Sequence, residues 1–96
     1  MKPARVLAVD PGYDRLGVAV LELQNGKEVL LHSQCIQTDP ATALDDRLVT
    51  LGEAFRDLLK THTPTIVGIE TLFFNKNVTT AIGVAQARGI IMYLAR

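Results

Sequence analysis

Two acidic residues, Asp10 and Glu70, each end a short apolar run of the sequence. Asp10 follows residues 6–9, Val-Leu-Ala-Val, and Glu70 follows residues 66–69, Ile-Val-Gly-Ile. Short apolar runs bounded by turn residues are typical of buried strands, and open α/β sheets place their sites at the carboxyl ends of such strands. One acid alone would more simply cap a turn or a helix. The matched pair instead predicts a shared site.

Two neighbouring carboxylates predict a divalent metal ion between them. If the strand at 65–70 lies parallel to the strand at 5–10, both acids emerge at the same end, on backbones about 4.8 Å apart. Unpaired carboxylates this close repel each other, whereas a hard divalent cation prefers oxygen ligands. Asp10 and Glu70 are therefore the predicted metal ligands.

Three antiparallel strands are expected over residues 5–38. The first, at 5–10, is predicted to be buried on both faces in the middle of the sheet. Residues 16–23 form the second, and Asn25-Gly26 after it is a strong signal for a hairpin turn. The third, at 28–38, mixes polar and apolar residues, as an edge strand with one wet face does.

The pattern then changes to that of a helix. Asp39 and Pro40 are predicted to be its N-cap and first helical residue. Apolar residues between 44 and 59 recur at spacings of three and four, which predicts one buried stripe, and charged residues such as Arg47 are expected on the solvent face. Pro64 ends this helix, which then serves as the crossover to the parallel strand at 65–70.

A second helix is expected from about Asn77 to the end of the chain, after a loop over residues 71–76. Small and apolar residues at helical spacing predict the stripe that packs inward. The stripe comprises Ala81, Ile82, Ala85, Gly89, Met92 and Leu94. The sequence still reads as helix at Arg96, so we expect it to be a fragment of a longer protein.

The composition narrows the class of protein. The 96 residues suffice for one domain. Ten basic and ten acidic residues cancel, so no overall charge attracts nucleic acid. Cys35 is the only cysteine, which excludes an intrachain disulfide, and no apolar run approaches a membrane span. We expect an intracellular protein in which neither Cys35 nor His32 does chemistry.

Four motifs occur in order along the chain: residues 9–12, Val-Asp-Pro-Gly; Ile-Glu at 69–70 followed by Phe73; Asn-Lys-Asn at 75–77; and Gln-Ala-Arg-Gly at 86–89. Together they resemble the N-terminal part of RuvC-type Holliday-junction resolvases, over nearly the whole chain. The resemblance implies an α/β fold, with a ribonuclease H-like mixed sheet of three antiparallel strands, then helix, parallel strand and helix. It makes residues 1–96 the N-terminal portion of a single domain.

The resemblance also implies a function in DNA recombination and repair. It implies a cytoplasmic, homodimeric, Mg²⁺-dependent endonuclease that nicks four-way DNA junctions symmetrically and works with branch-migration proteins. Asp10 and Glu70 match its metal ligands, Phe73 matches an aromatic residue that contacts DNA, and Lys76 and Arg88 match basic positions for DNA binding. Hydrolysis in such sites uses two cations roughly 4 Å apart. Two further acids lie in a segment beyond this sequence, so the isolated chain is expected to be inactive.

Three alternatives stay open at this point. Asp10, Gly12 and Gly17 also resemble the first phosphate-binding hairpin of actin-like ATPases and sugar kinases. An RNA-processing nuclease of the same superfamily would share the acids. A binding module without catalysis would use its terminal helix for dimerisation or for a partner protein.

Overall fold

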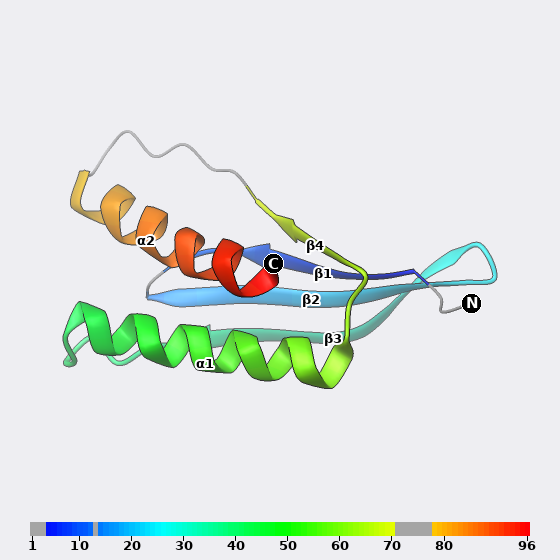
Figure 1. Ribbon diagram of the computed structural model, residues 1–96, viewed down its shortest axis with the longest axis horizontal. Coiled ribbons are helices and arrows are strands. Elements are labelled where there is room, and N and C mark those ends of the chain that lie inside the picture. The colour runs from blue at the N-terminus through cyan, green and yellow to red at the C-terminus, as the bar shows by residue number, and fades with distance from the viewer. Residues whose placement is uncertain (1–3, 13, 71–77) are drawn as a thin grey trace.

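The computed structural model describes residues 4–12, 14–70 and 78–96, with side chains in the last range described from residue 82 (Figure 1). Three antiparallel strands come first along the chain, followed by a helix, a fourth strand and a second helix. They are β1 (Arg5–Asp10), β2 (Arg15–Gln24), β3 (Lys27–Gln37), α1 (Leu44–His62), β4 (Ile66–Ile69) and α2 (Val78–Ala95). This order confirms the predicted succession of elements.

The sheet has the strand order β3-β2-β1-β4. Strand β1 pairs antiparallel with β2 and parallel with β4, and α1 is the crossover that connects β3 to β4. The predicted hairpin joins β2 to β3, and its residues Asn25 and Gly26 have φ angles of 52° and 78°. Both residue types tolerate this left-handed region, which is why the pair occurs in tight hairpins.

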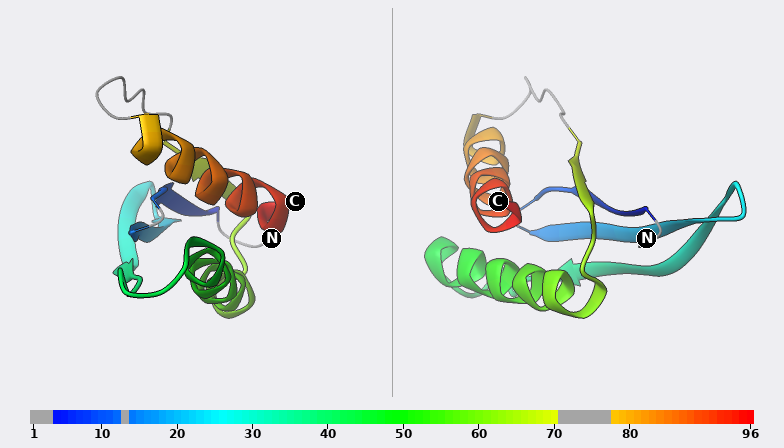
Figure 2. Two further views of the ribbon diagram at one scale, coloured as in Figure 1. Left: turned by 90° about the vertical axis from the view of Figure 1, so that its left-hand side faces the viewer. Right: turned by 45° about the vertical axis from the view of Figure 1, so that its right-hand side comes forward.

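Both helices cover the same face of the sheet (Figure 2). The core lies between them and the sheet, where Leu7, Leu16, Leu51, Phe55 and Ile91 are almost fully buried. Strand β1 is central, but the prediction that it is buried on both faces is wrong. Leu7 and Val9 are buried on the helix side, whereas the alternate residues of β1 are only half-buried or exposed. The second face carries no helix within the part of the chain that the structure describes.

Helix α1 starts later than its sequence signals predict. Its N-cap is Ala43, which makes no side-chain capping bond. Asp39 instead accepts a hydrogen bond from the Ala41 N–H at 2.9 Å, so this side chain closes a turn before the helix. Aspartate stabilises such local turns as readily as helix starts, and sequence alone does not separate the two. At the other end, Thr63 adopts a left-handed conformation directly before Pro64.

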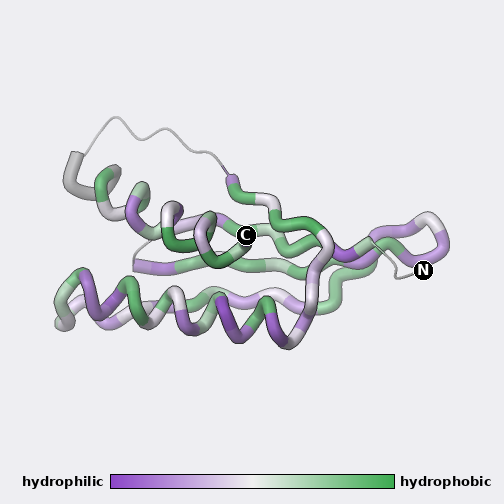
Figure 3. Tube along the Cα trace, viewed as in Figure 1, coloured by the Kyte–Doolittle hydropathy of each residue, from purple (hydrophilic) through white to green (hydrophobic). Residues whose placement is uncertain are grey.

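The inner stripe predicted for α2 is wrong for four of its six residues. Leu94 packs against the core as predicted, and the side chain of Ala81 lies outside the described residues. Ile82, Ala85, Gly89 and Met92 are exposed, whereas Ala87 and Ile91 are buried against the core. Figure 3 shows the reason, because hydrophilic and hydrophobic residues alternate along α1 but only short hydrophilic stretches interrupt α2. A helix that is apolar nearly all round gives no periodic signal for its core-facing side. Neither described helix is both long and apolar enough to cross a membrane.

A polar cluster ties the C-terminal end of α1 to the sheet. His62 of α1 stacks on His32 of β3, with ring centroids 5.1 Å apart. Arg5 donates from Nη1 to the carbonyl oxygen of His62 at 2.6 Å and pairs with the buried carboxylate of Glu22. Hydrogen bonds from Gln24 and Arg5 lower the pKa of Glu22.

The same cluster makes stability depend on pH. Burial, together with the charges of His32 and Arg5, lowers the pKa of His62 below its ordinary value of 6.5. The unfolded chain therefore binds a proton at this residue more readily than the folded chain, and folding stability falls as the pH drops below 6.5. We expect the melting temperature to decrease between pH 7.5 and 5.5, and the decrease to be smaller in His62→Gln. An unchanged slope in that variant would show that other groups carry the dependence.

Candidate functional site

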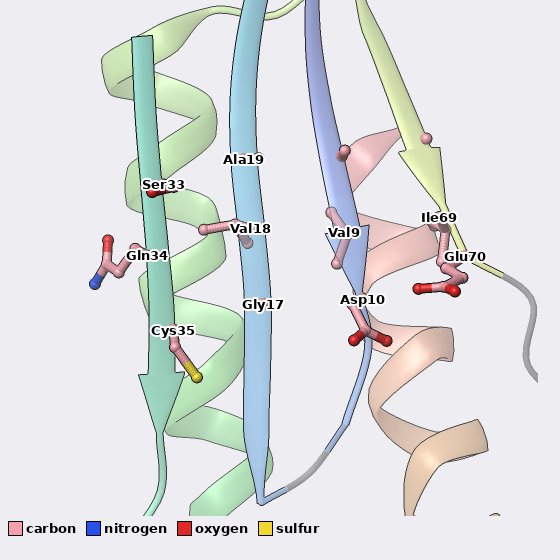
Figure 4. A pocket seen from close by; sticks show the side chains of 12 residues that line it. Val9, Asp10, Gly17, Val18, Ala19, Ser33, Gln34, Cys35, Ile69 and Glu70 are labelled. Carbon is pink, nitrogen blue, oxygen red and sulfur yellow. The ribbon is translucent and has the colours of Figure 1, made fainter. Parts of the chain in front are cut away.

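Asp10 and Glu70 lie at the same edge of the sheet, as predicted. Val9 of β1 is level with Ile69 of β4, so the acid that follows each residue leaves its strand at the same point. The Glu70 N–H donates to the Val9 carbonyl oxygen at 2.9 Å, which fixes the two strand ends side by side. Figure 4 shows both carboxylates projecting from neighbouring strand ends, with the helices behind the sheet. Both side chains are exposed.

These acids line an open depression of about 830 Å³ on the sheet face opposite α1 and α2. The strand register explains its floor: Asp10 is opposite Gly17, and Gly17 is opposite Cys35. In the next row, Gly68, Ala8, Ala19 and Ser33 follow one another across the four strands. Small side chains on every strand thus leave a hollow directly beside the carboxylates.

The turn after Asp10 depends on a glycine and on a contact with helix α1. A Cβ at Gly12 would lie 2.5 Å from the carbonyl oxygen of Arg15, so the turn needs glycine there. Arg47 donates to Asp14 Oδ1 at 2.7 Å and to Thr38 Oγ1 at 2.9 Å. Its side chain is only 11% exposed, which corrects the prediction of a solvent-facing residue. Sequence analysis missed this contact because its partners are distant in the chain.

The acid pair suits a hard divalent cation. Among the described residues, the three ion pairs join Arg5 to Glu22, Arg47 to Asp14 and Arg56 to Glu53, and neither Asp10 nor Glu70 takes part. Oxygen ligands with uncompensated negative charge are what Mg²⁺ binds. Within the described chain no third Asp, Glu, His or Cys joins them closely enough to complete a ligand group. The pair is therefore a candidate for part of a metal site.

Comparison with known proteins decides the family. Residues 6–96 match the family described as crossover junction endodeoxyribonuclease RuvC. The chain belongs to the RuvC family. RuvC of Mycolicibacterium smegmatis is 39% identical over 92 residues, which are 95% of this chain and 50% of that protein. The chain thus spans about half the length of the curated relatives it matches.

Solved structures agree with this assignment. T. thermophilus RuvC in complex with a Holliday junction substrate superposes with a TM-score of 0.85 at 26% identity, over 96% of this chain and 57% of that one. This match confirms the ribonuclease H-like mixed sheet. The Aquifex aeolicus PPX-GPPA enzyme is similar in fold alone, with a TM-score of 0.60 at 14% identity, over 99% of this chain and 33% of that one.

The three residues that match DNA-binding positions of RuvC stay predictions. Phe73 and Lys76 lie outside the described residues. Arg88 is half-buried on α2, and its Nη1 donates to Met92 Sδ at 3.2 Å. Its Nε is buried and has no hydrogen-bond partner among the residues described. The Arg88 guanidinium thus retains hydrogen-bonding capacity.

Cys35 is exposed on the floor of the depression, which the sequence did not indicate. Gly17 of β2 separates Cys35 on β3 from Asp10 on β1. At ordinary strand spacing, the backbones of Cys35 and Asp10 are therefore about 10 Å apart. We expect Cys35→Ala to leave junction cleavage unchanged in a form of the chain that is active. Loss of cleavage with an unchanged melting temperature would show that this thiol belongs to the site.

Proposed function

We propose that this chain is the N-terminal half of a Mg²⁺-dependent endonuclease that resolves Holliday junctions in DNA recombination and repair. The observation that carries the proposal is the position of Asp10 and Glu70 side by side at adjacent strand ends, in no ion pair with any described residue, in a chain of the RuvC family. T. thermophilus RuvC in its junction complex supports four-way junction DNA as the substrate.

Asp10 and Glu70 would hold the cation by their carboxylate oxygens. Bound there, Mg²⁺ would lower the pKa of a water and polarise the phosphate. The hollow beside the acids leaves room for a phosphodiester, because Gly17 places no side chain next to Asp10. Lys76 and Arg88 would neutralise neighbouring phosphates, and Phe73 would contact DNA near the junction.

Partners and location form a second part of the proposal. A homodimer would present one such site to each of two strands of the four-way junction, which symmetric nicking requires. Branch-migration proteins are the further partners that RuvC membership suggests. We place the protein in the cytoplasm, where its single cysteine suits a reducing compartment.

Junction cleavage by two forms of the protein tests the proposal. One is the 96-residue chain, and the other is an extended chain, in which the C-terminal half of M. smegmatis RuvC follows Arg96. On a labelled four-way junction in Mg²⁺, we expect paired nicks from the extended chain and none from the 96 residues, because two carboxylates place the catalytic ions too weakly. Failure of a folded extended chain to cleave would refute the proposed activity, and robust metal-dependent nicking by the short chain would refute the incomplete site.

A further inference from the structure

A basic side chain, Arg15, lies at the same end of the sheet as the two acids. Arg15 is the first residue of β2, and its neighbour Leu16 is fully buried on the helix side. Successive side chains of a strand point to opposite faces, so Arg15 shares a face with Gly17. A Cβ added at Gly17 would lie 3.5 Å from Asp10 Cβ. Arg15 therefore points to the sheet face that carries the depression, which we call the acid face.

The strand register places Arg15 just beyond the acids. Asp10 is opposite Gly17, and Arg15 lies two residues before Gly17 on β2. Two residues of a strand span about 7 Å and neighbouring strands are about 4.8 Å apart, so the Cα atoms of Arg15 and Asp10 are about 8 Å apart. Figure 4 shows β2 starting beyond Gly17, at the end of the sheet where both carboxylates lie. Because β2 and β4 flank β1, Arg15 and Glu70 are on opposite sides of Asp10.

The positive charge of Arg15 is not neutralised by any residue that the structure describes. Arg15 is exposed, and the three ion pairs among the described residues do not include it. The acid next to it in the sequence, Asp14, pairs with Arg47 of α1 at 2.7 Å. Gln37, opposite Arg15 on β3, carries no charge. The Arg15 guanidinium is thus free to bind an anion from solution.

Arg15 differs in its position from the other basic residues of the described strands, which are Arg5 and Lys27. The Arg5 guanidinium lies on the helix side, where it bonds to the carbonyl oxygen of His62. Lys27 is opposite Gln24 at the far end of the β2–β3 hairpin, and the alternation of β2 assigns this pair to the helix side. Since the whole chain has no net charge, attraction of a phosphate backbone to the acid face depends on a local cation.

The surface between Asp10 and Arg15 has room for a DNA backbone. Gly17 lies between them and has no side chain, and the depression extends over it. A smaller hollow of about 200 Å³ adjoins Arg15, and its acidic lining residue, Asp14, is the one that pairs with Arg47. A DNA strand with one phosphate at the acids can therefore pass over Gly17 and bring a neighbouring phosphate to Arg15. A guanidinium can bind two phosphate oxygens at once.

We propose that Arg15 binds a phosphate next to the scissile one, on the strand that is cut. The inference rests on the proposed function for its DNA substrate and adds a substrate contact from β2 to the acids of β1 and β4. This phosphate does not react, so its contact with Arg15 is equally strong before and in the transition state. Such a contact tightens substrate binding and leaves the chemical step unchanged.

Junction binding by the extended chain in Ca²⁺ tests the contact without cleavage. Arg15→Gln is expected to weaken binding about tenfold and to lower the salt dependence by about one phosphate, a slope change of about 0.9. Arg15→Lys keeps the charge and should keep the slope. Lys27→Gln removes a charge at the far end of the hairpin and should change neither quantity. In Mg²⁺, Arg15→Gln should raise KM and leave kcat within about twofold.

Junctions with one methylphosphonate, which lacks the phosphate charge, locate the contact. The substitution is made in turn at each of the two phosphates that flank the scissile one. At one of them, we expect about tenfold weaker binding by the unsubstituted extended chain and little further loss in Arg15→Gln, because the same interaction has already been removed.

Additive losses at both positions, or an unchanged affinity and salt slope in Arg15→Gln, would overturn the Arg15 contact. An extended chain that binds the junction but does not cleave it would instead refute the proposed activity. The affinities would still decide the phosphate contact in that case, so the two failures are distinguishable.

Discussion

Replacing Asp10 with Asn in the extended chain is expected to lower the rate of junction cleavage by more than about 100-fold. Mutating a residue that only hydrogen-bonds to a metal ligand already lowers activity by about 10- to 100-fold, and Asp10 is proposed to be a ligand itself. Glu70→Gln should have an effect of the same order. Both changes keep the size of the side chain and remove its charge, so the strand ends, which are joined by the Glu70–Val9 backbone bond, stay in place. Binding of the junction, measured by gel shift in Ca²⁺, should be largely retained.

Asp14→Asn is the matched control for this pair. Asp14 lies four residues after Asp10 but its carboxylate pairs with Arg47, at the helix side of the turn. We expect the control variant to keep most of the cleavage rate. Full activity in Glu70→Gln would remove this acid from the mechanism, and equal losses in all three variants would indicate a general disturbance of the edge.

Phe55→Ala is expected to destabilise the folded chain by about 3 to 5 kcal/mol, the usual cost of emptying a buried aromatic site. Phe55 is fully buried on α1 and belongs to the cluster that joins both helices to the sheet. A domain of this size has a free energy of unfolding of roughly 5 to 14 kcal/mol, so this change removes a large share. The melting temperature should fall by roughly 10 to 40 °C.

Asp57→Ala, two residues further along α1, provides the comparison. This side chain is exposed, and substitutions at such positions usually change the free energy of unfolding by less than about 0.5 kcal/mol. Thermal melts followed by circular dichroism would separate the two variants. Similar melting temperatures for both would show that the helices do not depend on the cluster around Phe55.

Much of the fold was predictable because its signals are local or repeat at a fixed period. The Asn25-Gly26 hairpin, the stripe of α1 and the two apolar runs that end in acids each correspond to an observed element. The side-by-side position of Asp10 and Glu70 followed from a single long-range step, the parallel crossover. A helix is the usual connection between parallel strands of one sheet, so this step needed little further information.

The failures come from residues with more than one favourable environment. Because the sequence of α2 is mostly uncharged, several rotations of the helix about its axis would place apolar residues against the core. In the structure, Ala87 and Ile91 are the ones buried there. Asp39 closes a turn instead of capping α1, because its carboxylate can accept a hydrogen bond from the backbone N–H of a turn as well as from that of a helix start. Arg47 reaches Asp14 across 33 positions of the sequence, a contact for which no local pattern exists.

Mn²⁺ binding to the 96-residue chain, followed by electron paramagnetic resonance, tests the metal site most directly. Mn²⁺ shares the preference of Mg²⁺ for carboxylate oxygen and reports its own bound fraction. We expect one weak site, with a dissociation constant on the order of 10⁻³ M, since two carboxylates supply few of the six ligands. Asp10→Asn and Glu70→Gln should each abolish this binding, and Asp14→Asn should preserve it. Equal binding by the wild-type chain and an Asp10→Asn, Glu70→Gln double variant would contradict the assignment of the metal site to this edge of the sheet.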